Sequence, residues 1–125
     1  VGSSYTMATA RDWARFGQLY LQDGVWQGER ILPQGWVAYS TTPTPQAPQG
    51  CYGAHFWLNA GTPGNPEDRK WPQLPRDLFW AQGYQGQSLT VIPSKRLVIV
   101  RLGLTLKSEA WVQGQFIAEA MEAFP

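Results

Sequence analysis

The chain has 125 residues, of which 43% are hydrophobic and 15% are charged, and its formal net charge is +1. A chain of this length has room for one hydrophobic core. The absence of a basic cluster argues against a nucleic-acid-binding protein and against a polybasic membrane anchor. No apolar stretch reaches the roughly 20 residues of a membrane-spanning helix. Because Cys51 is the single cysteine, an internal disulfide is excluded.

The first predicted element is a helix over residues 10–22. Thr9 suits its N-cap, and Asp12 follows at the spacing of a capping box. Apolar side chains at positions i, i+3, i+7 and i+8 form one face, consisting of Trp13, Phe16, Tyr20 and Leu21. Gly24 is expected to end the helix, because glycine readily takes the left-handed conformation that follows a last helical turn.

The middle of the chain predicts turns, one strand and two loops. Residues 24–32 are typical of a turn-rich connection, and Pro33 is expected to open a short helical turn. Residues 41–50 contain three prolines and predict an extended surface loop. Residues 52–59 alternate in the manner of a strand with aromatic side chains on both faces. Residues 60–78 contain four prolines and predict a long loop, which in a small domain is usually functional or mobile.

The C-terminal half predicts a β-hairpin. Residues 79–92 form a strand that is interrupted at Gly83 and Gly86. Residues 97–102 form its partner, because hydrophobic and β-branched runs on either side of a four-residue turn favour an antiparallel pair.

A final helix is expected from Ser108, as its N-cap, to about Ala123. Its buried face would consist of Ile117, Ala120, Met121 and Phe124. The predicted fold class is therefore α+β, with an antiparallel sheet flanked by an N-terminal and a C-terminal helix.

The chain lacks the nucleophile motifs of serine hydrolases. In the S-x-x-K motif a serine stands three residues before a lysine, but the three lysines of this chain follow Glu67, Ile92 and Leu104 at that spacing. Neither Asn59 nor Asn65 completes a Y-x-N or S-x-N motif, and no serine stands in G-x-S-x-G. We therefore expect these 125 residues alone to have no hydrolytic activity.

Other reactive side chains are sparse. His55, in the middle of a predicted strand, is expected to be a hydrogen-bonded structural histidine rather than a general base. One histidine and one cysteine do not make a zinc site, so no metal and no cofactor are predicted. Cys51 is interpreted as a packing residue or an exposed thiol. A glycosidase-type carboxylate pair is disfavoured, because most of the acidic residues fit as helix caps or solvated faces.

The segment from Gly83 to Gln87 has two interpretations. It fits a β-bulge or a kink at the edge of a sheet. A strand punctuated by glycine also exposes backbone N–H groups and lets a substrate approach closely. One such N–H that donates to a developing oxyanion contributes about 2.7–4 kcal/mol to catalysis.

An ordered set of short motifs carries a resemblance that covers nearly the whole chain. These motifs are Gly2-Ser3-Ser4, residues 9–17, 23–26, 30–33, 36–37, 52–53, 56–57, 83–87, 92–94 and 97–103. In this order the set resembles the C-terminal third of serine hydrolases of the β-lactamase/penicillin-binding-protein superfamily. The similarity is greatest to the class C-like branch, which includes class C β-lactamases, D-amino-acid peptidases, esterases and nylon-oligomer hydrolases.

The resemblance implies roles for five residues. The family's serine and lysine of S-x-x-K and its tyrosine of Y-x-N lie upstream, while its third motif, K-T-G or H-x-G, resembles Ala81-Gln82-Gly83. The backbone N–H of Tyr84 would then be the second donor of the oxyanion hole. Gln82 and Gln87 would line the substrate cleft, and Gly83 would let the acyl group lie against the strand. Because Ala81 replaces the family's lysine or histidine, esterase or amide-hydrolase activity is favoured over β-lactamase or carboxypeptidase activity.

The resemblance therefore implies that residues 1–125 are a single C-terminal fragment of a larger β-lactamase-like domain of a bacterial serine hydrolase. The absence of an initiator methionine agrees with this interpretation. The expected partners are the remainder of the parent chain and, in the intact enzyme, a small-molecule or peptide substrate. A homodimer formed through exposed strand edges is a further expectation, and no nucleic acid is expected. The compartment stays open between periplasm and cytoplasm.

The alternative interpretation is a non-catalytic module that binds carbohydrate or peptidoglycan. Exposed tryptophans would serve as stacking platforms, since aromatic side chains offer a large contact area. The candidates are Trp26, Trp36, Trp71 and Trp80. The competing explanation is that these side chains fill the core and its loops.

Overall fold

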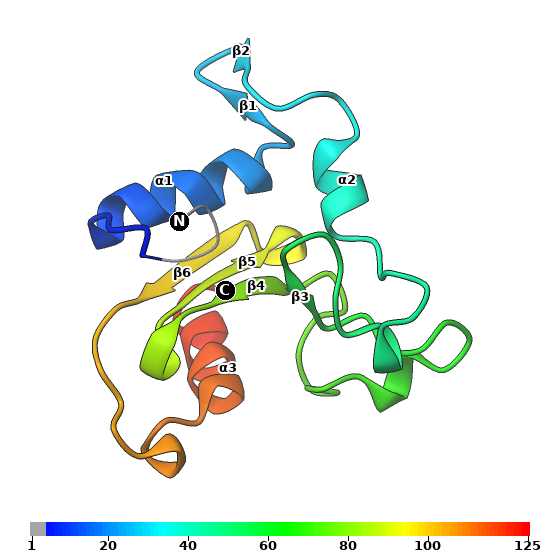
Figure 1. Cartoon of the computed structure of the whole chain (residues 1–125), viewed down its shortest axis with the longest axis vertical. Coiled ribbons are helices and arrows are strands. Elements are labelled where there is room, and N and C mark those ends of the chain that lie inside the picture. The colour runs from blue at the N-terminus through cyan, green and yellow to red at the C-terminus, as the bar shows by residue number, and fades with distance from the viewer. Residues whose placement is uncertain (1–4) are drawn as a thin grey trace.

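A four-stranded antiparallel sheet lies between two helices in the computed structural model, which describes residues 5–125. The strand order is β3-β4-β5-β6, with α1 on one face and α3 on the other (Figure 1). The sheet strands are β3 (Trp57–Leu58), β4 (Phe79–Gln82), β5 (Ser88–Ile92) and β6 (Leu97–Arg101). The helices are α1 (Ala10–Leu21), α2 (Trp36–Ser40) and α3 (Gln113–Ala123). The predicted α+β class is confirmed.

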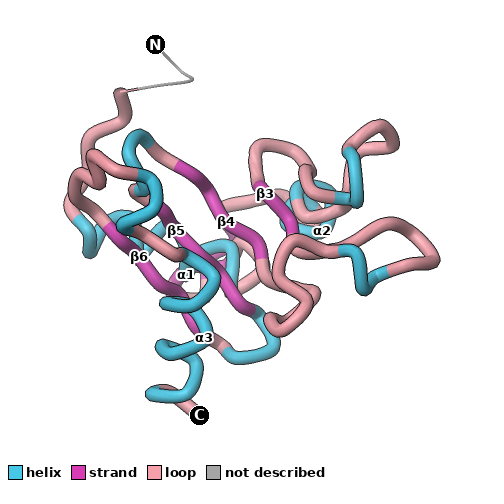
Figure 2. Tube along the Cα trace, turned by 90° about the horizontal axis from the view of Figure 1, so that it is seen from below, coloured by secondary structure: helices cyan, strands magenta, loops and turns pink. Residues whose placement is uncertain are grey.

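Two hydrophobic clusters, one on each face of the sheet, form the core. Successive side chains of β4 face opposite sides of the sheet, so Phe79 lies on the α1 side and Trp80 on the α3 side. The α1-side cluster consists of Phe56, Leu58, Phe79 and Val91, with Tyr20 and Leu21 packed against it. The α3-side cluster consists of Leu74, Leu78, Trp80, Ile92 and Ile117. Figure 2 shows the sheet from the α3 side. Because both faces are covered, all five residues of β5 are buried.

Helix α1 confirms the first prediction. The Thr9 hydroxyl caps it by accepting a hydrogen bond from the Asp12 amide at 3.2 Å. Gly24 has the expected left-handed φ of +79°. The buried position of the helix is Gly17, where a Cβ atom would lie 2.6 Å from a methyl group of Val98. Glycine therefore lets the helix backbone approach β6 closely, while Phe16 stays 40% exposed.

The predicted strand over residues 52–59 is wrong over most of its length. Only Trp57–Leu58 pairs with β4, and a single bridge joins Tyr52 to Trp57. The reason is a tight turn in which the Gly53 amide donates to the Phe56 carbonyl at 2.9 Å and His55 has a φ of +69°. A left-handed residue ends the extended conformation, so His55 lies exposed on a turn rather than in mid-strand.

Two other predicted boundaries also need correction. Residues 24–32 contain a small hairpin, β1 (Val25–Trp26) with β2 (Glu29–Arg30), rather than only turns. Helix α2 begins at Trp36, after Gly35 at a φ of +83°, so the helix does not begin at Pro33.

The last helix begins at Gln113 instead of near Ser108. Residues 108–110 form a separate 3₁₀ turn, and the extended Trp111 divides this turn from α3. Ile117 is buried as predicted, but Phe124 is 65% exposed because it lies beyond the end of the helix. None of the helices in the described residues is long and apolar enough to cross a bilayer.

Candidate functional site

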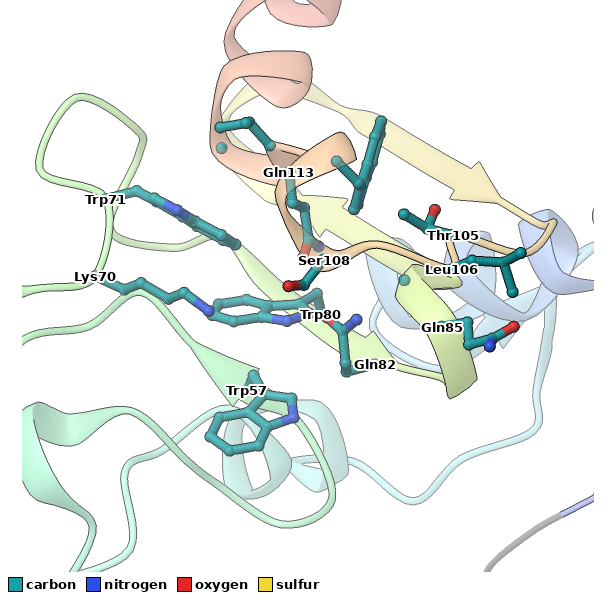
Figure 3. A pocket seen from close by; sticks show the side chains of 14 residues that line it. Trp57, Lys70, Trp71, Trp80, Gln82, Gln85, Thr105, Leu106, Ser108 and Gln113 are labelled. Atoms are coloured by element: carbon teal, nitrogen blue, oxygen red, sulfur yellow. The ribbon is translucent and has the colours of Figure 1, made fainter.

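An open pocket of about 680 Å³ lies on the α3 side of the sheet, beside the end of β4 (Figure 3). The tryptophans in its wall are Trp57, Trp71, Trp80 and Trp111. They come from β3, from the loop over residues 60–78, from β4 and from the segment before α3. The pocket thus brings together parts of the chain that are more than 50 residues apart.

The aromatic wall is built around Trp80. This side chain is only 1% exposed, and its ring centroid lies 4.6 Å from that of Trp71 and 6.3 Å from that of Trp57. The rings of Trp57 and Trp80 are inclined by only 20°. The Lys70 ammonium lies 4.8 Å from the Trp71 ring centroid and 5.1 Å from the Trp80 ring centroid, which are cation–π distances.

Asn59 holds the loop that carries Lys70 and Trp71. Its side chain is completely buried, and its amide nitrogen donates to the carbonyl oxygens of Trp71 at 3.0 Å, Leu74 at 3.3 Å and Pro75 at 3.1 Å. Its amide oxygen accepts a hydrogen bond from the Trp71 backbone N–H at 2.9 Å. One asparagine thereby contacts four polar groups of this loop, with its two amide hydrogens shared among three carbonyl oxygens.

A second contact closes the same loop nearer its start. The backbone N–H and the hydroxyl of Thr62 donate to the two carboxylate oxygens of Asp68 at 2.8 and 2.5 Å. The hydroxyl bond, followed by the backbone bond, holds the pKa of Asp68 below its ordinary value. Because the ionised form is favoured in the folded chain, this contact stabilises the loop at neutral pH and is lost as the pH falls through that lowered pKa.

The connection between β4 and β5 forms the rim of the pocket. The Gly83 amide donates to the Gln87 carbonyl at 2.7 Å, and a 3₁₀ turn over Tyr84–Gly86 lies between them. The turn is also held by residues outside it, since the Thr105 amide donates to Gln85 and the Arg101 guanidinium donates to Gly86, both at 3.0 Å.

The backbone N–H of Tyr84 is one of the free donors of this turn, together with those of Gln85 and Gly86. It has no hydrogen-bond acceptor among residues 5–125, and Tyr84 is 75% exposed. Neighbouring bonds fix the turn from both sides, so the direction of this N–H is set by the fold. Tyr84 thus carries an unpaired backbone donor next in the chain to Gln85, which lines the pocket.

The five residues that the family resemblance assigned to the site lie in different surroundings in the structure. Gln82 lines the pocket, whereas Gly83 and Tyr84, which follow it in the chain, are not among the lining residues. Ala81 packs against the α1-side cluster instead. Gln87 is half-buried beneath the turn, where its side-chain oxygen accepts a bond from the Gly103 amide at 3.4 Å.

The tryptophans proposed as stacking platforms do not share one surface. Trp71 and Trp80 line the pocket, and Trp80 belongs to the core. Trp26 lies in β1, and Trp36 lies in α2, where its indole N–H donates to the Tyr20 hydroxyl at 3.4 Å. Within residues 5–125 no three His, Cys, Asp or Glu side chains converge as a metal site.

Sequence reasoning missed several residues that build the pocket. Lys70 and Trp111 stand in segments without periodicity. Trp57 and Asn59 belong to the segment whose alternation predicted a strand but gave no sign of a pocket. The one available signal was the Lys-Trp dipeptide inside a loop longer than its neighbours. Their convergence depends on contacts between distant segments, which local patterns do not report.

A tight contact joins α3 to the pocket and gives a testable prediction. A Cβ atom at Gly114 would lie 2.6 Å from the Trp71 indole nitrogen. We expect Gly114→Ala to lower the free energy of unfolding by about 1–3 kcal/mol, since overpacking outweighs the gain in helix propensity. Urea unfolding of the full-length gene product measures this loss. The exposed Glu122→Ala is the matched control on α3, and equal stability of the two variants would contradict the contact.

The α+β architecture is consistent with part of a β-lactamase-like hydrolase domain, and two known proteins support this class. The chain is 30% identical over 105 residues to the 6-aminohexanoate-dimer hydrolase of Paenarthrobacter ureafaciens, an alignment that covers 75% of this chain and 24% of that protein. It also matches a solved structure named as the 6-aminohexanoate-dimer hydrolase of Bacillus anthracis. That match has a TM-score of 0.60 and 26% identity, and covers 93% of this chain and 28% of the other.

The chain therefore spans about a quarter of the length of each of these relatives. No protein-family model matches it. The similarity extends across most of the chain and is not confined to one motif.

Proposed function

We propose that these residues form one wall of the active site of a bacterial β-lactamase-like serine hydrolase. The reaction is hydrolysis of an ester, amide or β-lactam through an acyl-enzyme. The nucleophilic serine and its base belong to sequence outside these 125 residues, which are inactive alone. The observation that carries the proposal is the Tyr84 N–H, which has no acceptor among residues 5–125 and belongs to the turn whose residues Gln82, Gln85 and Gly86 line the pocket.

Each residue of the β4–β5 turn has a part in this mechanism. When the serine attacks the carbonyl carbon, negative charge develops on the carbonyl oxygen. The Tyr84 N–H donates a hydrogen bond to that oxygen. Gly83 has no side chain to block the approach of the acyl group, and Gln82 contacts the group that enters the pocket.

The relatives favour one bond type. Both are named hydrolases of 6-aminohexanoate dimer, which is an amide. Ala81 carries no charge, and its methyl group packs on the α1 side of the sheet. We therefore place amides and esters ahead of β-lactams as substrates.

Active-site labelling tests the proposal. We expect the full-length gene product to hydrolyse p-nitrophenyl esters and to react with a fluorophosphonate probe. Peptide mapping should place the label on a serine outside residues 1–125, because no serine of this segment stands in a nucleophile motif. The 125-residue chain expressed alone serves as the control and should remain unlabelled. A label on one of its own serines would overturn the proposal.

A further inference from the structure

We infer that Arg101 is a positioning residue that holds the backbone donors of the β4–β5 turn in place for the reaction. This inference rests on the proposed function, because it concerns the same site. Arg101 is the last residue of β6 and does not itself line the pocket. The inference therefore extends the site to a side chain that acts on the pocket wall from outside the pocket.

The guanidinium of Arg101 joins three residues of the pocket wall. Its Nη1 donates to the Gly86 carbonyl at 3.0 Å, and its Nη2 donates to the Thr105 hydroxyl at 2.6 Å. Its central carbon lies 4.1 Å from the centroid of the Trp111 ring, which is a cation–π distance. Gly86, Thr105 and Trp111 all line the pocket. One side chain thus connects the β4–β5 turn to the segment between β6 and α3.

The guanidinium fits closely against the backbone of the turn. A Cβ atom at Gly86 would lie 3.1 Å from Nη1 of Arg101 and 3.2 Å from Cδ1 of Trp111. None of the ion pairs within residues 5–125 includes Arg101. Its contacts in the described part of the chain are therefore those that it makes with the wall, and a shorter side chain would leave the turn without this support.

The hydrogen bonds of the turn distinguish its carbonyl groups from its N–H groups. All three carbonyl oxygens of Tyr84–Gly86 accept hydrogen bonds, whereas the three N–H groups have no acceptor among residues 5–125. In chain order, the donors to these carbonyls are the Gln87 N–H at 3.4 Å, the Thr105 N–H at 3.0 Å and the Arg101 guanidinium. Because the C=O and the N–H of a trans peptide point in opposite directions, bonds that fix the carbonyls also direct the N–H groups.

Arg101 acts at both ends of the turn. Its bond to the Gly86 carbonyl fixes the peptide plane between Gly86 and Gln87. The N–H of that plane is the one that donates to the Tyr84 carbonyl. A donor stabilises a developing oxyanion only if it is already in position when the charge develops. Loss of the guanidinium should therefore slow the reaction and leave substrate binding nearly unchanged.

Steady-state kinetics of the full-length gene product on a p-nitrophenyl ester test this inference. Arg101→Ala is expected to lower kcat by about 10–100-fold, while KM changes by less than about threefold. Arg101→Lys should recover part of kcat, because lysine can donate to the Gly86 carbonyl but lacks the fork that also reaches Thr105. Arg11→Ala is the matched control and should keep the kcat of the wild type. Arg11 is exposed on α1 and forms no ion pair within residues 5–125.

A double-mutant cycle with Tyr84→Pro separates positioning from a general loss of structure. If Arg101 acts through the Tyr84 N–H, Arg101→Ala should lower kcat by less than about twofold further once that N–H is absent. A merely structural role would lower kcat by the same factor in both backgrounds, and that result would overturn the inference. Urea unfolding of each variant gives the folded fraction by which kcat is corrected.

A measurement that needs no turnover completes the test. In the full-length gene product labelled with ¹⁵N-tyrosine, we expect the backbone order parameter of Tyr84 to fall from about 0.85 toward about 0.6 in Arg101→Ala. Arg101→Lys provides the same readouts if the alanine variant does not fold.

An unchanged order parameter would overturn the inference, and so would a wild-type kcat in Arg101→Ala. These results are separable from the proposed function. A wild type that hydrolyses nothing would refute the hydrolase, while a loss of order at Tyr84 would still show that Arg101 holds the turn.

Discussion

Tyr84→Pro is expected to lower kcat of the full-length gene product by about 10²–10³-fold, because the change removes a single oxyanion donor. Proline has no backbone N–H, and the N–H that it deletes makes no hydrogen bond within residues 5–125. The Tyr84 side chain is 75% exposed, so its loss removes little packing.

The backbone of this turn tolerates proline. Tyr84 is the first residue of a 3₁₀ turn, a position that suits the fixed φ of proline. The preceding Gly83 is extended, with φ −106° and ψ −179°, as a residue before proline prefers. The free energy of unfolding should therefore stay within about 0.5 kcal/mol of the wild type.

Tyr84→Ala is the matched control, since it removes the same side chain and keeps the N–H. Its kcat should stay close to that of the wild type. Steady-state kinetics on a p-nitrophenyl ester, together with urea unfolding of each variant, measure both quantities. If the two variants have equal kcat, the N–H of Tyr84 is not the donor, and the assignment fails.

Asn59→Ala is expected to have the largest effect on stability, a loss of about 3–4 kcal/mol in the free energy of unfolding. The substitution removes four hydrogen bonds and leaves three carbonyl oxygens and one N–H without the partner that they share. Asn59 is fully buried, so water does not readily replace it. Denaturant unfolding of the full-length gene product measures the loss.

A comparison of substitutions at Asn59 identifies the mechanism. Asn59→Asp keeps the size of the side chain but directs a carboxylate at three carbonyl oxygens, so it should destabilise at least as much as alanine. Asn65→Ala is the control, because Asn65 is an exposed asparagine of the same loop. A small effect of Asn59→Ala, similar to that of the control, would show that the four bonds do not hold the loop.

Local patterns predicted the elements whose formation depends on neighbours in sequence. Helix α1 has its cap and its terminating glycine within 16 residues, and the structure confirms both. Its apolar face is confirmed in part, because Tyr20 and Leu21 pack on the core while Phe16 stays exposed. The pair β5–β6 is joined by a short turn, and its register follows from that turn. The break in the strand at Gly83 was also correctly placed, since the glycine stands where β4 ends.

Patterns failed where a single residue or a distant contact decides the conformation. The alternation of residues 52–59 predicted a strand, but the left-handed His55 ends it. Serine is a residue type that favours helix N-caps, but Ser108 does not cap α3. The helix begins only at Gln113, after the extended Trp111. In both places the residue types allow two conformations, and the packing of the surrounding segments selects one.

The composition and charge of the sequence argued against a polybasic nucleic-acid-binding protein, and its single cysteine excluded an internal disulfide. Its motifs indicated a hydrolase-like α+β fold without a nucleophile of its own. These conclusions depend on which residue types are present and on short spacings. Only the tertiary structure decided that Lys70 lies over two tryptophans and that Asn59 holds their loop. The side chains that form the pocket come into contact only when the sheet, the long loop and α3 pack together. Because these segments are far apart in the sequence, local residue spacing does not predict their contact.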